Sequence, residues 1–209
     1  MKRVMTATGS LTLLALFALG VFYAGSASAG GGPNSVFLWT GPLPGLVLVL
    51  SDNVQIFHFN DPFTFTCQHF AAHGVISNGK AMTAKEVTLA GQYTGCEDTL
   101  LPAPVIVSPV EFLLNADGSL AVVNKPIVIT IPELGCSIKI NNGGANSNIR
   151  LLLYLNRPKD VLAHVEIKGI VALGSAGLCG EAGGANTEVL SRGLWLISVD
   201  GGTIQWDSK

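Results

Sequence analysis

Residues 159–170 read KDVLAHVEIKGI, and this stretch decides the fold class. Apolar residues occupy every second position, at Val161, Ala163, Val165 and Ile167. The positions between them carry mostly polar residues, namely Leu162, His164, Glu166 and Lys168. Successive side chains of a β-strand point to opposite faces, whereas a helix requires an apolar period of 3.6 residues. The stretch therefore predicts a strand with one buried face.

Further strands are predicted on both sides of this one. Residues 86–89 and 136–140 repeat the alternation. Four other runs are apolar on both faces, at 46–50, 127–131, 151–155 and 194–199. Such runs are typical of central strands covered on both sides, and equally of strands that face a partner.

Turn residues separate these runs. Asp117-Gly118 predicts a hairpin between 110–114 and 120–123, and Asp200-Gly201-Gly202 predicts another between 194–199 and 203–206, because such residues tolerate positive φ. No stretch after residue 29 keeps a helical period for three turns. We expect an all-β fold, an antiparallel β-sandwich, with a jelly roll or a barrel as the alternative.

The N-terminus has the order of a secretory signal peptide. Lys2 and Arg3 precede an apolar run at 11–24, and Ala27-Ser28-Ala29 forms a small-residue cleavage site. The run is shorter than the roughly 20 residues that a spanning helix needs. We predict a signal-peptide helix within residues 1–29, cleavage near Ala29-Gly30, and a secreted, extracellular chain with no transmembrane segment. Residues 30–35 are then a flexible lead-in to a single β-rich domain, 36–209.

Composition limits the partners. Charged residues make up 12% of the chain, about half the usual share. The formal net charge is −2, and Lys and Arg are not clustered, which argues against nucleic acid. A weakly charged surface favours self-association or contact with the cell envelope.

The four cysteines are expected to form disulfides, because export places them in an oxidising compartment. Three pairings of Cys67, Cys96, Cys136 and Cys179 are open. We favour Cys67–Cys96 with Cys136–Cys179, since sequential pairing closes the shorter loops. A zinc site is the competing interpretation, but it requires close cysteine pairs, and none is present.

Short motifs surround these cysteines. They are Phe-Thr-Phe-Thr-Cys at 63–67, Tyr-Thr-Gly-Cys at 93–96, Gly-Cys-Ser-Ile at 135–138 and Leu-Cys-Gly at 178–180. Over residues 63–206 the pattern resembles a loose group of uncharacterised secreted bacterial proteins. The resemblance implies a secreted β-rich domain with sequential disulfides, and it implies no activity.

One polar cluster is a candidate metal site. His58, Asp61, His69 and His73 lie close together in the sequence, and imidazoles and carboxylates are good ligands for zinc or copper. His69 and His73 would share a face only on a helix, and this segment is predicted to leave a strand for a loop. The competing interpretation is that all three histidines are ordinary strand and loop residues.

Aromatic side chains are the other candidates for binding. Trp39, Trp195 and Trp206 could form a platform for a sugar, although core positions are the commoner fate of tryptophan. Trp206 lies close to the C-terminus, so we expect it to be partly exposed and name it as a candidate ligand-binding residue.

Catalytic motifs are missing from the sequence. Residues 173–177 resemble the Gly-x-Ser-x-Gly nucleophile elbow, but Leu173 stands in place of the first glycine, and His-Glu-x-x-His does not occur. We therefore expect no cofactor and a non-catalytic surface or interaction domain. The alternatives are a module that binds a sugar or small apolar ligand, and a metal-dependent enzyme built on the histidine cluster.

Overall fold

A computed structural model describes residues 31–42, 44–51, 53–59, 64–76, 83–99, 103–140, 149–150, 152–173 and 187–208. These residues form β-strands in large antiparallel sheets, which confirms the predicted all-β class. The signal-peptide prediction, residues 1–29, lies outside the described part. Within that part, no helix is long and apolar enough to cross a membrane.

The strands follow one another with a single turn of 3-10 helix, Pro132–Leu134, among the described residues. Their bounds are β1 Val36–Thr40, β2 Gly45–Ser51, β3 Gln55–His58, β4 Thr64–Ile76, β5 Thr83–Ala84, β6 Glu86–Asp98, β7 Ile106–Val107, β8 Val110–Asn115, β9 Ser119–Val122, β10 Ile127–Ile131, β11 Cys136–Ile140, β12 Ile149–Arg150, β13 Leu152–Asn156, β14 Val161–Leu173, β15 Thr187–Val199 and β16 Thr203–Asp207.

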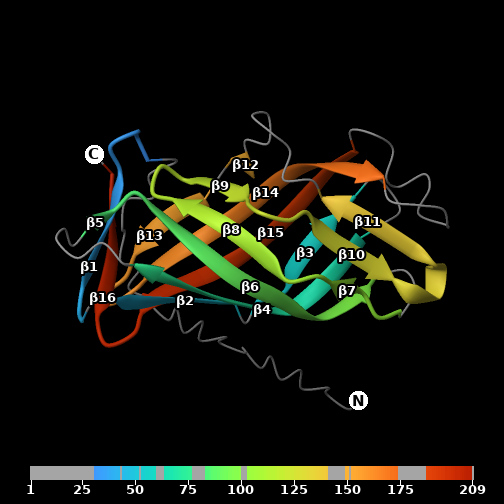
Figure 1. Ribbon diagram of the computed structural model, residues 1–209, viewed down its shortest axis with the longest axis horizontal. Coiled ribbons are helices and arrows are strands. Elements are labelled where there is room, and N and C mark those ends of the chain that lie inside the picture. Colours follow the sequence, from blue (N-terminus) through green and yellow to red (C-terminus); the bar gives the residue numbers. More distant parts are fainter. Residues whose placement is uncertain are drawn as a thin grey trace, which may run out of the picture.

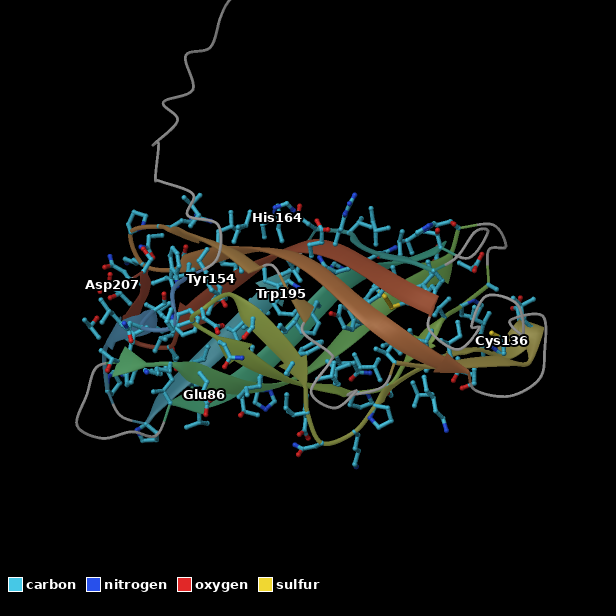
Figure 2. All side chains as sticks on the ribbon, turned by 90° about the horizontal axis from the view of Figure 1, so that it is seen from above. Glu86, Cys136, Tyr154, His164, Trp195 and Asp207 are labelled. Carbon is cyan, nitrogen blue, oxygen red and sulfur yellow. A yellow bond between two sulfur atoms is a disulfide. The ribbon has the colours of Figure 1, made fainter. Side chains whose placement is uncertain are left out.

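The stretch that decided the fold class forms β14. Val161, Ala163 and Val165 are buried, whereas His164 is exposed, as the alternation predicted. Figure 2 shows His164 at the outside of the sheet, with Trp195 and Tyr154 between the strands.

The large sheet has the order β12-β9-β8-β6-β4-β2-β15-β14-β11-β10-β7, and β13 and β3 pair beside it. Its long members β4, β6, β14 and β15 each have 13 residues. A small sheet of order β16-β1-β5 lies at one end of the molecule, and β7, β10 and β11 lie at the other (Figure 1). Next to β7, the Val105 N–H donates to the Cys96 carbonyl at 2.9 Å. The segment before β7, the last strand in the sheet order, therefore hydrogen-bonds to β6, which lies near the middle of that order.

The two predicted hairpins have different outcomes. β8 and β9 pair across the Asn115–Gly118 turn, as predicted. The hairpin of 194–199 with 203–206 is wrong, because β16 pairs with β1 instead. The physical reason is that β15 has no free edge at this level, since its residues Leu196 and Ile197 already pair with β2 on one side and β14 on the other.

Strands β4 and β6 change their buried face together at one level. In β4, Phe65 and Cys67 are buried, and after two exposed residues the buried positions become Phe70 and Ala72. In β6 the two consecutive exposed residues are Thr94 and Gly95, and Gly95 adopts φ +63°. We call this place in the two strands the step. Both strands rotate by one residue here, so their register is the same on both sides of the step.

A disulfide closes the β4–β6 pair just beyond this step. Cys67 and Cys96 lie directly opposite each other and are bonded, which confirms the first predicted pair. Cys136 is also disulfide-bonded. Cys179 lies outside the described residues, so its pairing with Cys136 stays a prediction.

Aromatic rings fill the centre of the fold. Phe70 stacks on Trp195 at 4.6 Å between ring centroids and contacts Tyr93 at 4.4 Å. At the end near the small sheet, Phe37 contacts Tyr154 at 5.3 Å. Burial raises the pKa of the hydroxyls of Tyr93 and Tyr154 above the usual value for tyrosine.

The polar groups of two buried aromatic side chains, Trp195 and Tyr154, are hydrogen-bonded. The Trp195 indole N–H donates to the Gln55 amide oxygen at 3.1 Å, and the Gln55 amide N–H donates to the Ser51 hydroxyl at 2.8 Å. The Tyr154 hydroxyl donates to the Asn115 carbonyl at 2.8 Å. Each buried ring thereby avoids the cost of an unsatisfied polar group.

Candidate interaction surface

The histidines of the predicted metal site are spread over two strands. His58 ends β3, where its Nδ1 lies 2.8 Å from the Thr64 hydroxyl. His69 and His73 both lie on β4, four residues apart, and a strand of that length spans roughly 14 Å. Metal–nitrogen bonds are only about 2 Å long, so these two side chains do not share an ion.

Asp61, the carboxylate of that prediction, lies outside the described residues. Among the residues that are described, no group of three or more His, Cys, Asp or Glu could hold a metal ion. The described histidines therefore do not assemble the predicted site.

Trp206 is buried, so the expectation that it is partly exposed is wrong. Its side chain is 6% exposed, and its indole N–H donates to the Ala116 carbonyl at 2.7 Å. The backbone of Trp206 is held as well, because the Asn156 side-chain amide bonds both its N–H and its carbonyl at 2.7 Å. Pairing with β1 turns the ring inward despite its position near the end of the chain.

An apolar row crosses the outer face of the large sheet. Leu155 of β13 is paired with Leu162 of β14, which is paired with Leu196 of β15. Leu196 is in turn paired with Leu50 of β2, and Leu50 with Ala71 of β4. The inner neighbours of these positions are buried, so the four leucines and Ala71 point away from the core.

More apolar side chains extend this row along β2 and β4. Leu46 and Leu48 lie on the outer face of β2, and Val75 lies opposite Leu46 on β4. The exposed fraction is 38% for Leu46, 47% for Leu50 and 55% for Val75. We call the outward side chains of these two sets the leucine band: Leu46, Leu48, Leu50, Ala71, Val75, Leu155, Leu162 and Leu196.

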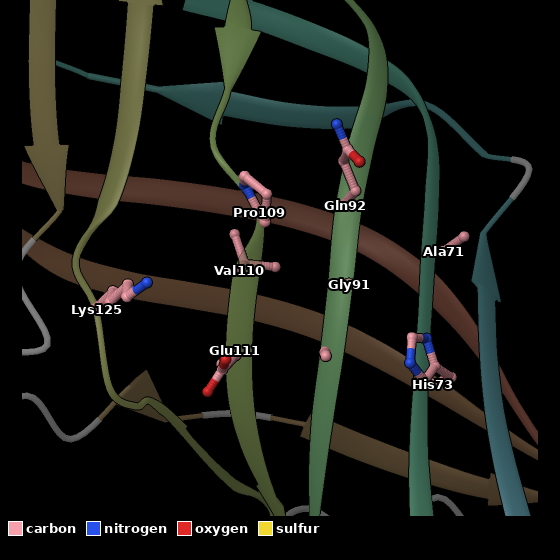
Figure 3. A pocket seen from close by; sticks show the side chains of 9 residues that line it. Ala71, His73, Gly91, Gln92, Pro109, Val110, Glu111 and Lys125 are labelled. Atoms are coloured by element: carbon pink, nitrogen blue, oxygen red, sulfur yellow. The ribbon is translucent and has the colours of Figure 1, made fainter.

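A hollow adjoins the leucine band where the band reaches β4. Its volume is about 420 Å³, and its lining residues are Ala71, His73, Ala90, Gly91, Gln92, Pro109, Val110, Glu111 and Lys125. Figure 3 shows His73 on one side of β6, with Glu111 and then Lys125 on the other. Ala71 belongs to both the band and the hollow, so the two form one continuous surface.

The register of three strands shapes the hollow. His73, Ala90 and Glu111 are paired in one row across β4, β6 and β8. The short side chain of Ala90 leaves space between the imidazole and the carboxylate, whose strands lie about 10 Å apart. Lys125 is placed by a tight turn in which Asn124 adopts φ +65° and donates its side-chain N–H to the Glu111 carboxylate. The hollow thus offers separate polar contacts beside an apolar band.

Comparison with known proteins gives no match, whether with protein-family models, with curated proteins or with solved structures. These comparisons therefore assign no activity to this chain.

The leucine band left a partial signal in the sequence. The runs at 46–50, 151–155 and 194–199 are apolar on both faces, and facing a partner was one of their two predicted meanings. The hollow left no signal in the sequence. Its polar residues His73, Glu111 and Lys125 come from separate segments, which only the strand register brings together.

Proposed function

We propose that this chain is an exported, non-catalytic β-domain that works by surface contact, through the leucine band, in the extracellular space or at the cell envelope. The outward row of Leu155, Leu162, Leu196 and Leu50 is the observation that carries the proposal. Large exposed apolar patches on β-proteins mark interaction sites, since leaving them in water costs free energy.

The disulfide supports the exported setting. Cys67–Cys96 would be reduced in a typical cytoplasm and persists in an oxidising compartment. The apolar segment at 11–24 with the cleavage site at 27–29 supplies the route of export.

The test compares a variant in the band with one outside it. Val75→Glu places a charge at the edge of the band, and Ile106→Glu places one on β7, where the native side chain is 57% exposed. Each protein is expressed with its leader in an exporting bacterium, and the fraction retained on washed cells is compared with the fraction in the medium. We expect Val75→Glu to lower retention several-fold and Ile106→Glu to leave it unchanged. Equal retention of the wild type and both variants contradicts the proposal.

The hollow supports a second candidate, the binding of a sugar or small apolar ligand. A volume of about 420 Å³ lies in the range of small-molecule sites, and the lining combines apolar residues with an imidazole, a carboxylate and an ammonium group. Calorimetric titration with a glycan panel tests this candidate. Binding that Glu111→Gln weakens would favour it, and the absence of heat with every glycan would remove it.

For the scaffold we propose the sandwich predicted from the sequence. Phe112 of β8 contacts Trp195 of β15 at 5.6 Å between ring centroids, although three strands separate β8 from β15 in the sheet order. A sheet folded into two facing layers accounts for this contact.

A further inference from the structure

We propose that the hollow between β4, β6 and β8 binds a free α-amino acid with an aliphatic side chain. Such a ligand is a zwitterion, which distinguishes it from the sugar or apolar molecule of the second candidate function at the same site. Three features of the hollow support it, namely the small side chains of its floor, the two opposite charges at one side, and the apolar path across to the other side.

Small side chains form the floor of the hollow. In one row of outward positions, Ala90 of β6 lies between His73 of β4 and Glu111 of β8. In the neighbouring row, Ala71 is paired with Gln92. Ala71 and Ala90 are therefore diagonal neighbours, and longer side chains surround their two methyl groups. The result is a depression of about 420 Å³, a volume typical of sites for small molecules.

One acid and one base lie at the β8 side of the hollow (Figure 3). The Glu111 carboxylate accepts a hydrogen bond from the Asn124 side chain, which holds the carboxylate in place. The backbone of Lys125 is fixed by the turn at Asn124, in which the Lys125 N–H donates to the Val123 carbonyl at 2.8 Å. None of the ion pairs among the described residues joins Glu111 to Lys125. Within that part of the chain, the ammonium group and the second carboxylate oxygen remain available to a ligand.

These two charges favour a zwitterionic ligand. An ammonium group of the ligand bonds the Glu111 carboxylate, and a carboxylate of the ligand bonds the Lys125 ammonium, each through a charge-assisted hydrogen bond. Because the acid and the base balance each other, the hollow favours neither a polyanion nor a polycation. An α-amino acid carries its ammonium and carboxylate groups on one carbon atom, so both groups reach the same side of the hollow.

The remainder of the hollow suits an aliphatic side chain. From the β8 side, the side chain of the ligand crosses the methyl groups of Ala90 and Ala71 towards β4. The strands that carry Glu111 and His73 lie about 10 Å apart, which leaves room for a side chain of the length of leucine. An aromatic platform for a sugar is missing, since the described lining contains no Phe, Tyr or Trp.

The experiment titrates the purified exported protein with leucine, isoleucine, valine and methionine in a calorimeter. Three further probes each lack one part of leucine: N-acetylleucine lacks the ammonium group, leucinamide lacks the carboxylate, and glycine lacks the side chain. We expect at least one of the four amino acids to bind with a dissociation constant below about 1 mM. Each of the three probes should bind at least about 10-fold more weakly than leucine, because it loses a charge-assisted hydrogen bond or the apolar contact.

Variants of the protein test the position of the site. Glu111→Gln and Lys125→Met each remove one charge from the hollow, and Ala90→Leu fills its floor. Glu133→Gln and Lys139→Met are the matched controls, because both native side chains are exposed and lie outside the lining. We expect the first three variants to raise the dissociation constant of the amino acid at least about 10-fold, and the controls to leave it unchanged. Circular dichroism checks that each variant is folded.

Three outcomes overturn the inference. They are the absence of binding with all four amino acids, binding of N-acetylleucine or leucinamide as tight as that of leucine, and equal affinities of Glu111→Gln and Glu133→Gln. Failure here is distinguishable from failure of the functions proposed above. A protein that binds a glycan and no amino acid ends this inference and leaves the second candidate standing. Retention on cells that Val75→Glu lowers depends on the leucine band alone, and neither result in the calorimeter changes it.

Discussion

The two faces of β2 carry similar residues and have opposite surroundings. Val47 and Val49 on the inner face are fully buried, at 0% exposure. Leu46 and Leu50 on the outer face are 38% and 47% exposed, although leucine is at least as apolar as valine. Hydrophobicity alone therefore does not decide burial in this strand. Burial follows the side of the sheet on which the aromatic rings lie, and the opposite side stays partly exposed.

The largest expected effect comes from a charge on the inner face. Val49→Asp places a carboxylate among fully buried apolar side chains, where nothing replaces its lost hydration. We expect a loss of at least about 4 kcal/mol in the free energy of unfolding, which is close to the whole stability of a typical domain. Urea denaturation followed by tryptophan fluorescence measures it. A loss below about 1 kcal/mol would mean that the inner face of β2 is not part of the core.

The disulfide on the inner face gives the next largest effect. Replacing both Cys67 and Cys96 by Ala opens a loop with a sequence separation of 29 residues. The entropy gained by the unfolded chain corresponds to a loss of about 3 kcal/mol. The melting temperature of the double variant, compared with that of the wild type without reductant, measures this. An unchanged melting temperature would show that strand pairing alone holds β4 against β6.

Alkaline pH should lower the free energy of unfolding through the two buried tyrosines, Tyr93 and Tyr154. Burial raises the pKa of Tyr93 and of Tyr154 above the ordinary value for tyrosine, about 10, so the folded state keeps both hydroxyls protonated while the unfolded state releases the protons. Stability is complete below pH 10 and falls above it, by about 1.4 kcal/mol per pH unit for each tyrosine. Urea denaturation at several alkaline pH values measures the slope, and Tyr154→Phe should halve it. A slope that Tyr154→Phe leaves unchanged would contradict this.

A smaller effect is expected where the buried face changes sides. Gly95 has φ +63°, and a Cβ there would meet the Gln68 side chain at 3.1 Å. Gly135 is a matched control, because it has φ +58° and nothing within 4 Å of such a Cβ. We expect Gly135→Ala to cost about 1 kcal/mol in unfolding free energy through backbone strain, and Gly95→Ala to cost up to about 1 kcal/mol more through contact. Equal losses in urea denaturation would show that Gln68 moves aside freely.

The smallest effect on stability belongs to the outer face. Leu50→Glu exchanges one exposed side chain for another, so the unfolding free energy of the monomer should change by less than about 0.5 kcal/mol. Urea denaturation at high dilution measures this, and dilution matters because self-association would add to the stability of the wild type. A loss similar to that of Val49→Asp would remove the contrast between the two faces.

Local patterns predicted most of the strands and little of the surface. The alternation at 159–170 was sufficient for β14, and Asp117-Gly118 was sufficient for the β8–β9 hairpin. The same turn chemistry at Asp200-Gly201-Gly202 predicted a hairpin that does not form, because the edges of β15 are already occupied by the preceding strand β14 and by the distant strand β2. Which strands pair depends on competition for strand edges along the whole chain, and local patterns do not show this competition. The hollow between His73 and Glu111 depends on it as well.

The tyrosine and cysteine of the Tyr-Thr-Gly-Cys motif show what local sequence did encode. Tyr93 and Cys96 are both buried although three positions separate them, which no regular strand permits. Thr94 and Gly95 supply the step that makes both possible. The motif therefore places a buried tyrosine and a disulfide-bonded cysteine on either side of the step.

The pairing of β1 with β16 also governs when the molecule can finish folding. Val36–Thr40 hydrogen-bonds with Thr203–Asp207, so the earliest described strand depends on the latest. β1 can pair with β5 earlier, but its longer pairing with β16 forms only after the last described strand is available. Such a high contact order slows folding. The small sheet at this end of the molecule is therefore completed last.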